Sequence, residues 1–157
     1  EGAPALMVAC GRSHTLAVTR AGALYACGLG EYGQLGLNDK ERRTVFERVG
    51  LPVLSDARIV TASARAYHSA AVTEDGALWT WGDGASGKLG HGESGNPFAH
   101  HSDGDDRFVP TRVAAASLHG TRIGRCRPLP TDHAVALALH HPRTEPFSVL
   151  RRVFDPD

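Results

Sequence analysis

The sequence predicts an all-β protein built as part of a β-propeller, and three observations support this prediction. A block of about fifty residues occurs twice, each copy contains β-hairpin signals, and no stretch keeps helical apolar periodicity over three turns. The chain has 157 residues, of which 41% are hydrophobic, as in ordinary folded domains. We therefore expect a single propeller fragment with about two complete blades and a partial third.

The internal repeat is visible in ungapped register. Residues 14–36, HTLAVTRAGALYACGLGEYGQLG, recur at residues 68–90 as HSAAVTEDGALWTWGDGASGKLG, an offset of 54 residues. Residues 45–49 (VFERV) then correspond to residues 109–113 (VPTRV) at an offset of 64, so the second unit carries a ten-residue insertion. We assign repeat 1 to about residues 6–50, repeat 2 to 59–113 with its insertion at 91–108, a partial repeat 3 to 114–139, and an irregular tail to 140–157.

Each complete repeat contains a predicted hairpin. Residues 14–19 and 68–73 alternate apolar positions and end in β-favouring side chains, as strands do. Gly22 and Gly76 follow them and supply the positive φ that a tight hairpin turn requires. The returning strands are expected at residues 24–27 and 78–81.

A glycine-rich loop follows each returning strand. Its glycines are too closely spaced for a regular strand or helix, so we expect a close crossing of backbones there. The structural positions of this loop are Gly28 and Gly36 in the first unit and Gly82 and Gly90 in the second.

A unit of this size is too small to bury its own sheet faces, so neighbouring units must stack in a propeller or a solenoid. We favour the propeller because its blades leave only short, protected edges. Two complete units and a fragment are too few to close a ring, and the sequence does not start with Met. The remaining blades of a longer parent chain are therefore expected partners.

The two units resemble the regulator of chromosome condensation repeat, a blade of a seven-bladed propeller. The resemblance rests on the His-x-x-Ala-Val-Thr strand, the Gly-Ala-Leu-aromatic strand, the Gly-x-Gly-x-x-Gly-x-Leu-Gly loop and the closing Pro-Thr-Arg-Val. It covers residues 6–113 well and residues 114–139 in part. The sequence departs from the pattern at Phe46, which stands where the second unit has Pro110, and at Cys27, which stands where it has Trp81.

The resemblance implies the fold but leaves the function open, because fold does not determine function. Members of the family include the nucleotide exchange factor of the GTPase Ran, chromatin-bound proteins, substrate-recruiting parts of ubiquitin ligases, ciliary scaffolds and a plant ultraviolet photoreceptor.

Three histidines, His14, His68 and His133, occupy one position of the repeat. Equivalent positions in successive blades lie at separate places around a ring, so we do not expect a metal triad. A structural role is expected instead, in which each imidazole ties a loop to a carbonyl inside its own blade. No metal site or cofactor is predicted.

Enzymatic chemistry is not expected. The strings GLGEYG at residues 28–33 and GDGASG at residues 82–87 match the dinucleotide fingerprint, but they lie between short strands rather than before a helix. Serines beside His14 and His68 lack the Gly-x-Ser-x-Gly elbow of a hydrolase and belong to different blades. We therefore predict no catalytic residue.

The insertion at residues 91–108 is the one predicted contact surface. A long loop on a rigid scaffold is where binding residues gather, and the alternative is a solvated polar loop. Its spacing matches neither a calcium loop nor a fixed histidine pair. The candidate partner-binding residues are His100, His101, Asp103, Asp105, Asp106 and Arg107.

Charge and composition exclude several partners. Seventeen basic residues balance 17 acidic ones, so no overall basic field favours nucleic acid, and no apolar run is long enough to span a membrane. The three cysteines form no CxxC pair, which indicates a reducing compartment, cytoplasmic or nuclear. We expect a non-enzymatic protein-protein interaction module, a propeller scaffold or substrate-recruiting domain; the alternative is a guanine nucleotide exchange factor for a Ran-like small GTPase.

Overall fold

The computed structural model describes residues 4–50, 52–92, 105–114, 123–128 and 135–139, and it confirms the all-β partial propeller. The first sheet, which we call the first blade, is antiparallel with strand order β1-β2-β3-β4. Its strands are β1 (Ala5–Cys10), β2 (His14–Thr19), β3 (Leu24–Gly28) and β4 (Arg43–Arg48).

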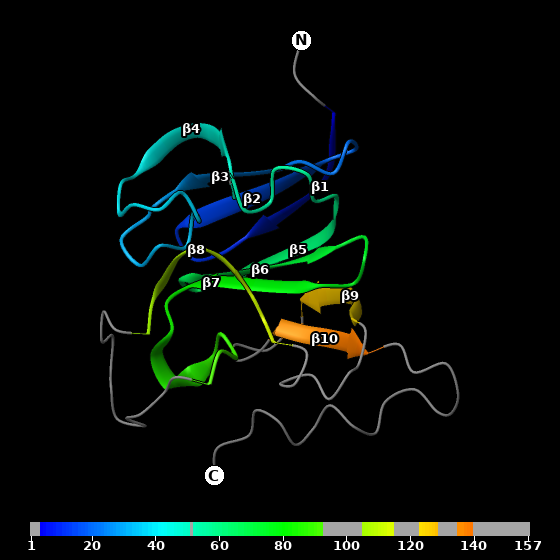
Figure 1. Ribbon diagram of the computed structural model, residues 1–157. Helices are drawn as coiled ribbons and strands as arrows, with labels where there is room; N and C mark the ends of the chain where they lie inside the picture. The colour runs from blue at the N-terminus through cyan, green and yellow to red at the C-terminus, as the bar shows by residue number, and fades with distance from the viewer. Residues whose placement is uncertain (1–3, 51, 93–104, 115–122, 129–134, 140–157) are drawn as a thin grey trace.

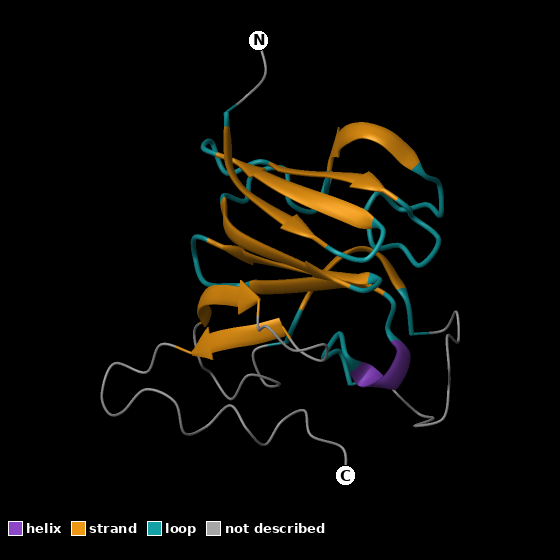
Figure 2. Cartoon of the chain, turned by 180° about the vertical axis from the view of Figure 1, so that it is seen from behind, coloured by secondary structure: helices purple, strands orange, loops and turns teal. Residues whose placement is uncertain are grey.

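The second blade repeats this arrangement in the order β5-β6-β7-β8. The register repeats as well, because His14 lies opposite Gly28 in the first blade and His68 lies opposite Gly82 in the second. Its strands are β5 (Ile59–Arg65), β6 (His68–Thr73), β7 (Leu78–Gly82) and β8 (Arg107–Arg112), with a short 3-10 turn, η1 (Ala85–Gly87), after β7 (Figure 2).

A third sheet begins on the far side of the second blade. β9 (Ile123–Pro128) and β10 (Val135–Leu139) pair as an antiparallel hairpin. Figure 1 shows the two blades as successive layers with this hairpin beyond the second, and β9 contacts β5 and β6. These contacts correspond to those between the first two blades, in which β5 contacts β1 and β2.

The hydrophobic core lies between the two blades. In β2, Leu16 and Val18 are fully buried while Thr15 and Ala17 on the other face are only half-buried, so one face of the first blade packs against the second. Burying one Leu or Val side chain contributes about 1.5–3 kcal/mol. The core comprises Leu16, Val18, Leu24, Ala26, Leu35 and Val49 of the first unit, Leu54 of the linker, and Ile59, Ala62, Ala71 and Trp81 of the second.

The hairpin turns follow the sequence prediction. Gly22 and Gly76 adopt φ of 85° and 83°. At Gly28 and Gly82 the backbone crosses that of the preceding hairpin so closely that a Cβ would lie 2.4 Å from the Ser13 carbonyl oxygen and 2.5 Å from that of Tyr67. Only glycine fits such an approach.

Within the part of the chain that the structure describes, no helix is long and apolar enough to cross a bilayer.

Candidate functional site

Four connections emerge at one end of the two blades, which we call the loop end. Alternate connections of an antiparallel sheet share an end, which places residues 11–13 and 29–42 of the first blade together with the described residues 66–67, 83–92 and 105–106 of the second. Two backbone hydrogen bonds join the blades at this end: the Arg12 amide donates to the Ala66 carbonyl (3.1 Å), and the Asn38 amide donates to the carbonyl of Phe108 near the start of β8 (2.9 Å). The loop end is therefore one continuous surface.

An aromatic and cationic cluster lies where the blades meet at the loop end. The rings of Tyr32 and Tyr67 lie 4.8 Å apart between centroids, and the Arg12 guanidinium lies 5.9 Å from the Tyr67 centroid. Both tyrosines are half-buried and Arg12 is exposed. Tyr and Arg are the side chains that most often dominate binding energy at protein interfaces.

The turn that presents Tyr67 is strained. Ala66 adopts φ of 37°, a region that residues other than glycine rarely occupy. Such strain persists only where surrounding contacts hold it, and it is frequent at binding sites. No motif of the sequence predicts this cluster. Its one local signal is that Tyr67 stands where the first unit has Ser13.

A second contact between a cation and an aromatic ring lies further along the loop end. The Lys40 ammonium lies 5.3 Å from the Phe108 centroid, again bridging the two blades. Arg43 is held by two carboxylates, at 2.6 Å from Asp39 and 2.8 Å from Glu47. These contacts fix the base of the long β3-β4 connection.

The predicted insertion residues divide into three groups. His100, His101 and Asp103 lie outside the described residues. Asp106 is buried at 7% exposure, and its Oδ1 accepts a hydrogen bond from the Gly84 amide (2.9 Å), so its carboxylate holds the loop inside the blade.

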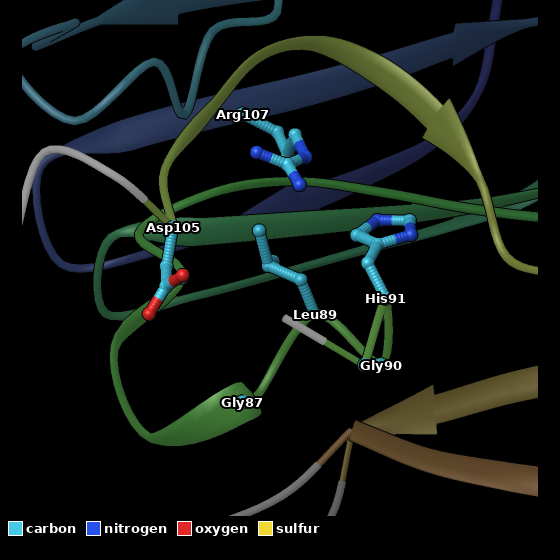
Figure 3. A pocket seen from close by; sticks show the side chains of 8 residues that line it. Gly87, Leu89, Gly90, His91, Asp105 and Arg107 are labelled. Carbon is cyan, nitrogen blue, oxygen red and sulfur yellow. The ribbon is translucent and has the colours of Figure 1, made fainter. Parts of the chain in front are cut away.

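Asp105 and Arg107 are half-buried and line a pocket together with His91 and the glycine loop of the second blade. The pocket has about 220 Å³ of empty space, including space open to solvent. Figure 3 shows Asp105 and His91 on opposite sides of Leu89, with Arg107 above them. Within the described residues, no group of three His, Cys, Asp or Glu side chains is placed to hold a metal ion.

His14 joins the two blades. Its Nε2 lies 2.9 Å from Ser69 Oγ, and the Ser69 hydroxyl donates to the Gln34 carbonyl (2.8 Å). Because that hydroxyl has a single proton, His14 Nε2 must be the donor to Ser69. The same Gln34 carbonyl accepts a hydrogen bond from Trp81 Nε1 (2.9 Å).

This partner differs from the expected one. A carbonyl inside the same blade was predicted for His14, whereas the structure pairs it with a hydroxyl 55 residues away in the next blade. The repeat shows which positions are equivalent, but not which positions of one unit contact the next. His68 is half-buried, and His133 lies outside the described residues.

Burial keeps both described repeat histidines neutral. It lowers the pKa of His14 to about 4, with a smaller contribution from nearby His68. It also lowers the pKa of His68 to about 4, where Lys88 and Arg65 act in the same direction and Asp83 opposes them. Because His14 and Ser69 are buried at 3% and 0% exposure, this pair is inaccessible to a substrate and is structural rather than nucleophilic.

The two GxGxxG strings do not form a dinucleotide site. The first glycine of each string, Gly28 or Gly82, is the last residue of a strand, β3 or β7. Residues 29–33 then lead into hydrogen-bonded turns, and residues 83–87 end in the three-residue turn η1. The dinucleotide motif requires the glycines to open a helix that faces a pyrophosphate, and neither string does so.

Comparison with known proteins agrees with this architecture. Two family models described as the regulator of chromosome condensation (RCC1) repeat match the chain, one at residues 8–34 and 60–88 and the other at residues 75–124, together more than half of its length. The ultraviolet-B receptor UVR8 of Arabidopsis thaliana is 43% identical over 108 residues, which are 69% of this chain and 22% of the receptor. The X-linked retinitis pigmentosa GTPase regulator of Homo sapiens is 45% identical over 84 residues, which are 54% of this chain and 8% of the regulator.

The fold is also that of a solved structure. Yeast RCC1 (Prp20), crystallised bound to Kap60, superposes with a TM-score of 0.63 over 78% of this chain and 27% of its own, at 22% identity. The chain thus spans less than a third of each of these relatives. Repeat sequence, blade register and family match agree, and the chain belongs to the regulator of chromosome condensation repeat family.

Proposed function

We propose that this chain is a non-enzymatic interaction module that binds a partner protein through its loop end. The observation that carries the proposal is that both long connections emerge on one end of two packed blades, beside the cluster of Arg12, Tyr32 and Tyr67. The blades hold the described parts of these loops in place, so binding a partner loses little conformational entropy there. The free thiols of Cys10 and Cys27 fit a reducing compartment, and we place the interaction in the cytoplasm or nucleus.

The insertion extends this surface. It leaves the second blade after His91 and returns at Asp105, next to the pocket at the loop end. Its residues His100, His101 and Asp103, together with Asp105 and Arg107, are proposed contacts with the partner. Asp106 is proposed to hold the loop rather than to bind, because its carboxylate is occupied by the Gly84 amide.

Affinity capture with the full-length parent from its own cells tests the proposal. Partners should be lost from a variant lacking residues 93–104 and from Tyr67→Ala with Arg12→Ala. They should be retained by Glu74→Ala, an exposed change in the β6-β7 turn at the opposite end. The proposal fails if the loop-end variants capture the same proteins in the same amounts as the unmodified chain.

The second candidate is a nucleotide exchange factor for a small GTPase, favoured by the name of the GTPase regulator that the chain resembles. In that case the loop end would stabilise the nucleotide-free GTPase, which is catalysis by differential binding. Capture should then enrich a GTPase most strongly after EDTA treatment. Purified parent should accelerate release of a fluorescent guanine nucleotide, and Tyr67→Ala should abolish that acceleration.

A further inference from the structure

The middle of β4 arches away from its own sheet. Gly28 of β3 lies opposite Arg43, and Ala26 lies opposite Glu47, so three residues of β3 span five residues of β4. A mismatch of this kind is a β-bulge, which bends the strand and leaves the extra residues unpaired with the neighbouring strand. Figure 1 shows β4 curving over the edge of the first blade, and residues 44–46 form this arch.

The second blade has the same mismatch, because the register of β7 with β8 shifts between Thr80 and Gly82. The arch is therefore a property of the repeat rather than of one blade. Its side chains differ between the two copies: residues 44–46 are Thr-Val-Phe, whereas the equivalent residues 108–110 are Phe-Val-Pro. The first arch has a hydroxyl group and the second has none, so a modification of that hydroxyl would distinguish the two blades.

The arch of the first blade presents its side chains to solvent. Thr44 is exposed, and Val45 and Phe46 are 66% and 48% exposed. Two carboxylates close the base of the arch by binding the guanidinium of Arg43, one before the arch and one after it. The Thr44 hydroxyl therefore lies on a protruding segment whose two ends are held in place.

Basic residues precede this hydroxyl and apolar residues follow it. Arg42 and Arg43 stand directly before Thr44, and Val45 and Phe46 stand directly after it. Arg42 is exposed, like the hydroxyl. Protein kinases select their substrates by the pattern of charges around the acceptor, and an acidic kinase groove binds arginine through charge-assisted hydrogen bonds. The exposed segment therefore fits a kinase that selects arginine before the acceptor.

We propose that Thr44 is a phosphorylation site for a serine/threonine protein kinase that selects arginine two residues before the acceptor and an aliphatic residue after it. The Thr44 hydroxyl oxygen attacks the γ-phosphorus of Mg-ATP. The new oxygen–phosphorus bond forms while the bond from that phosphorus to the β-γ bridging oxygen breaks. The hydroxyl proton passes to the catalytic Asp of the kinase, and ADP leaves. The proposal is independent of the partner that binds the loop end.

The phosphate changes the electrostatics at the base of the arch. It carries a charge of about −1.5 to −2 at pH 7, and it is attached next to Arg43 in the chain. Asp39 and Glu47 bind the Arg43 guanidinium at 2.6 and 2.8 Å, so the phosphate competes with both carboxylates and repels them. Because these contacts hold the β3-β4 connection, phosphorylation acts on a loop at the loop end.

Incubation of the purified full chain with such a kinase and Mg-ATP, followed by mass spectrometry of its peptides, tests the proposal. We expect a phosphate on Thr44, and Thr44→Val should remove it. Arg42→Ala should lower kcat/KM for this site about tenfold or more, because the kinase loses a charge-assisted hydrogen bond. Arg48→Ala, which removes an exposed arginine of the same strand beyond the arch, should leave kcat/KM unchanged.

A synthetic peptide of residues 38–48 separates the accessibility of the arch from the preference of the kinase. The folded chain should be phosphorylated with a kcat/KM within about tenfold of the peptide's, because the arch is already exposed. A folded chain that is modified more slowly than that, or at other residues, would overturn the proposal. So would a peptide that is not modified at Thr44, or an Arg42→Ala chain that is modified as fast as the unmodified one.

Discussion

A single carbonyl organises the polar contacts between the blades. Gln34 O accepts hydrogen bonds from Ser69 and from Trp81, and Ser69 in turn accepts one from His14. All four residues are almost completely buried, so each lost partner leaves a desolvated polar atom, which costs about 1–3 kcal/mol. The repeat histidine therefore stabilises an interface rather than a single loop.

His14→Ala should lower the free energy of unfolding by about 1–3 kcal/mol, because the Ser69 oxygen loses its donor inside the core. Urea unfolding measures the change. His14→Gln keeps a side-chain N–H near the position of Nε2 and should recover part of the loss. Equal stability of His14→Ala and the unmodified chain would contradict a structural role for this histidine.

Stability should also fall in mild acid. The pKa of His14 and His68 is about 4 in the folded chain, against the ordinary value of 6.5 for histidine, and burial is the main cause of both shifts. Between these values the unfolded chain binds more protons, so the free energy of unfolding decreases as the pH falls from 6.5 to about 4. It is unaffected by these groups above pH 7.

Urea midpoints at pH 7.5 and pH 5 measure this dependence. His14→Gln should have a smaller difference between the two midpoints than the unmodified chain, because one of the two titrating groups is gone. A difference that is unchanged in His14→Gln would show that the acid sensitivity comes from other groups.

At the scale of elements, the hairpins could be predicted and the loop end could not. Alternating apolar positions at residues 14–19, with a glycine after them, suffice to predict β2 and its turn. The cluster of Arg12 and Tyr67 depends instead on the conformation of a turn. The turns between β1 and β2 and between β5 and β6 have equivalent residues in the same register, but Ala66 adopts positive φ and its counterpart Arg12 does not. No residue pattern in the sequence predicts the positive φ of Ala66.

The two glycine loops allow equivalent glycines, Gly36 of the first blade and Gly90 of the second, to be compared. Gly36 and Gly90 are equivalent and adopt nearly equal φ of 72° and 75°. A Cβ at Gly36 would lie 2.9 Å from Trp81 Nε1 and Val49 Cγ1, whereas at Gly90 the nearest described atom is 3.9 Å away. Gly36→Ala should therefore destabilise the chain more than Gly90→Ala, since the backbone cost of about 1–2 kcal/mol is common to both. Equal losses in thermal unfolding would show that packing against Trp81 contributes nothing.

For the whole molecule, the decisive feature is an asymmetry between two nearly identical blades. Equivalent positions of the two blades differ in exposure, because the second blade has a described neighbour in the first. Val8 is 55% exposed, whereas the equivalent Ala62 is 3% exposed, and Phe46 is 48% exposed, whereas the equivalent Pro110 is fully buried. Leu6 and Val45 are exposed at 56% and 66% on the same strands, β1 and β4. Exposed apolar side chains on the two edge strands of a sheet favour association.

The 157-residue chain should therefore self-associate in a concentration-dependent way, through apolar faces and strand edges that lack a neighbouring blade. Sedimentation velocity over a hundredfold range of concentration measures this. Val8→Ser should weaken association, and so should Phe46→Pro, which restores the residue of the second blade and removes a backbone N–H from the outer strand.

The exposed linker residue Val53 supplies the control for this face. Val53→Ser removes a side chain of the same size and similar exposure, 47%, but from outside the two strands. It should leave association unchanged, because the driving force is burial of the β1 and β4 surface rather than total exposed apolar area. A monomer whose sedimentation and unfolding are independent of concentration would contradict the prediction, and it would mean that the first blade is stable with one face in water.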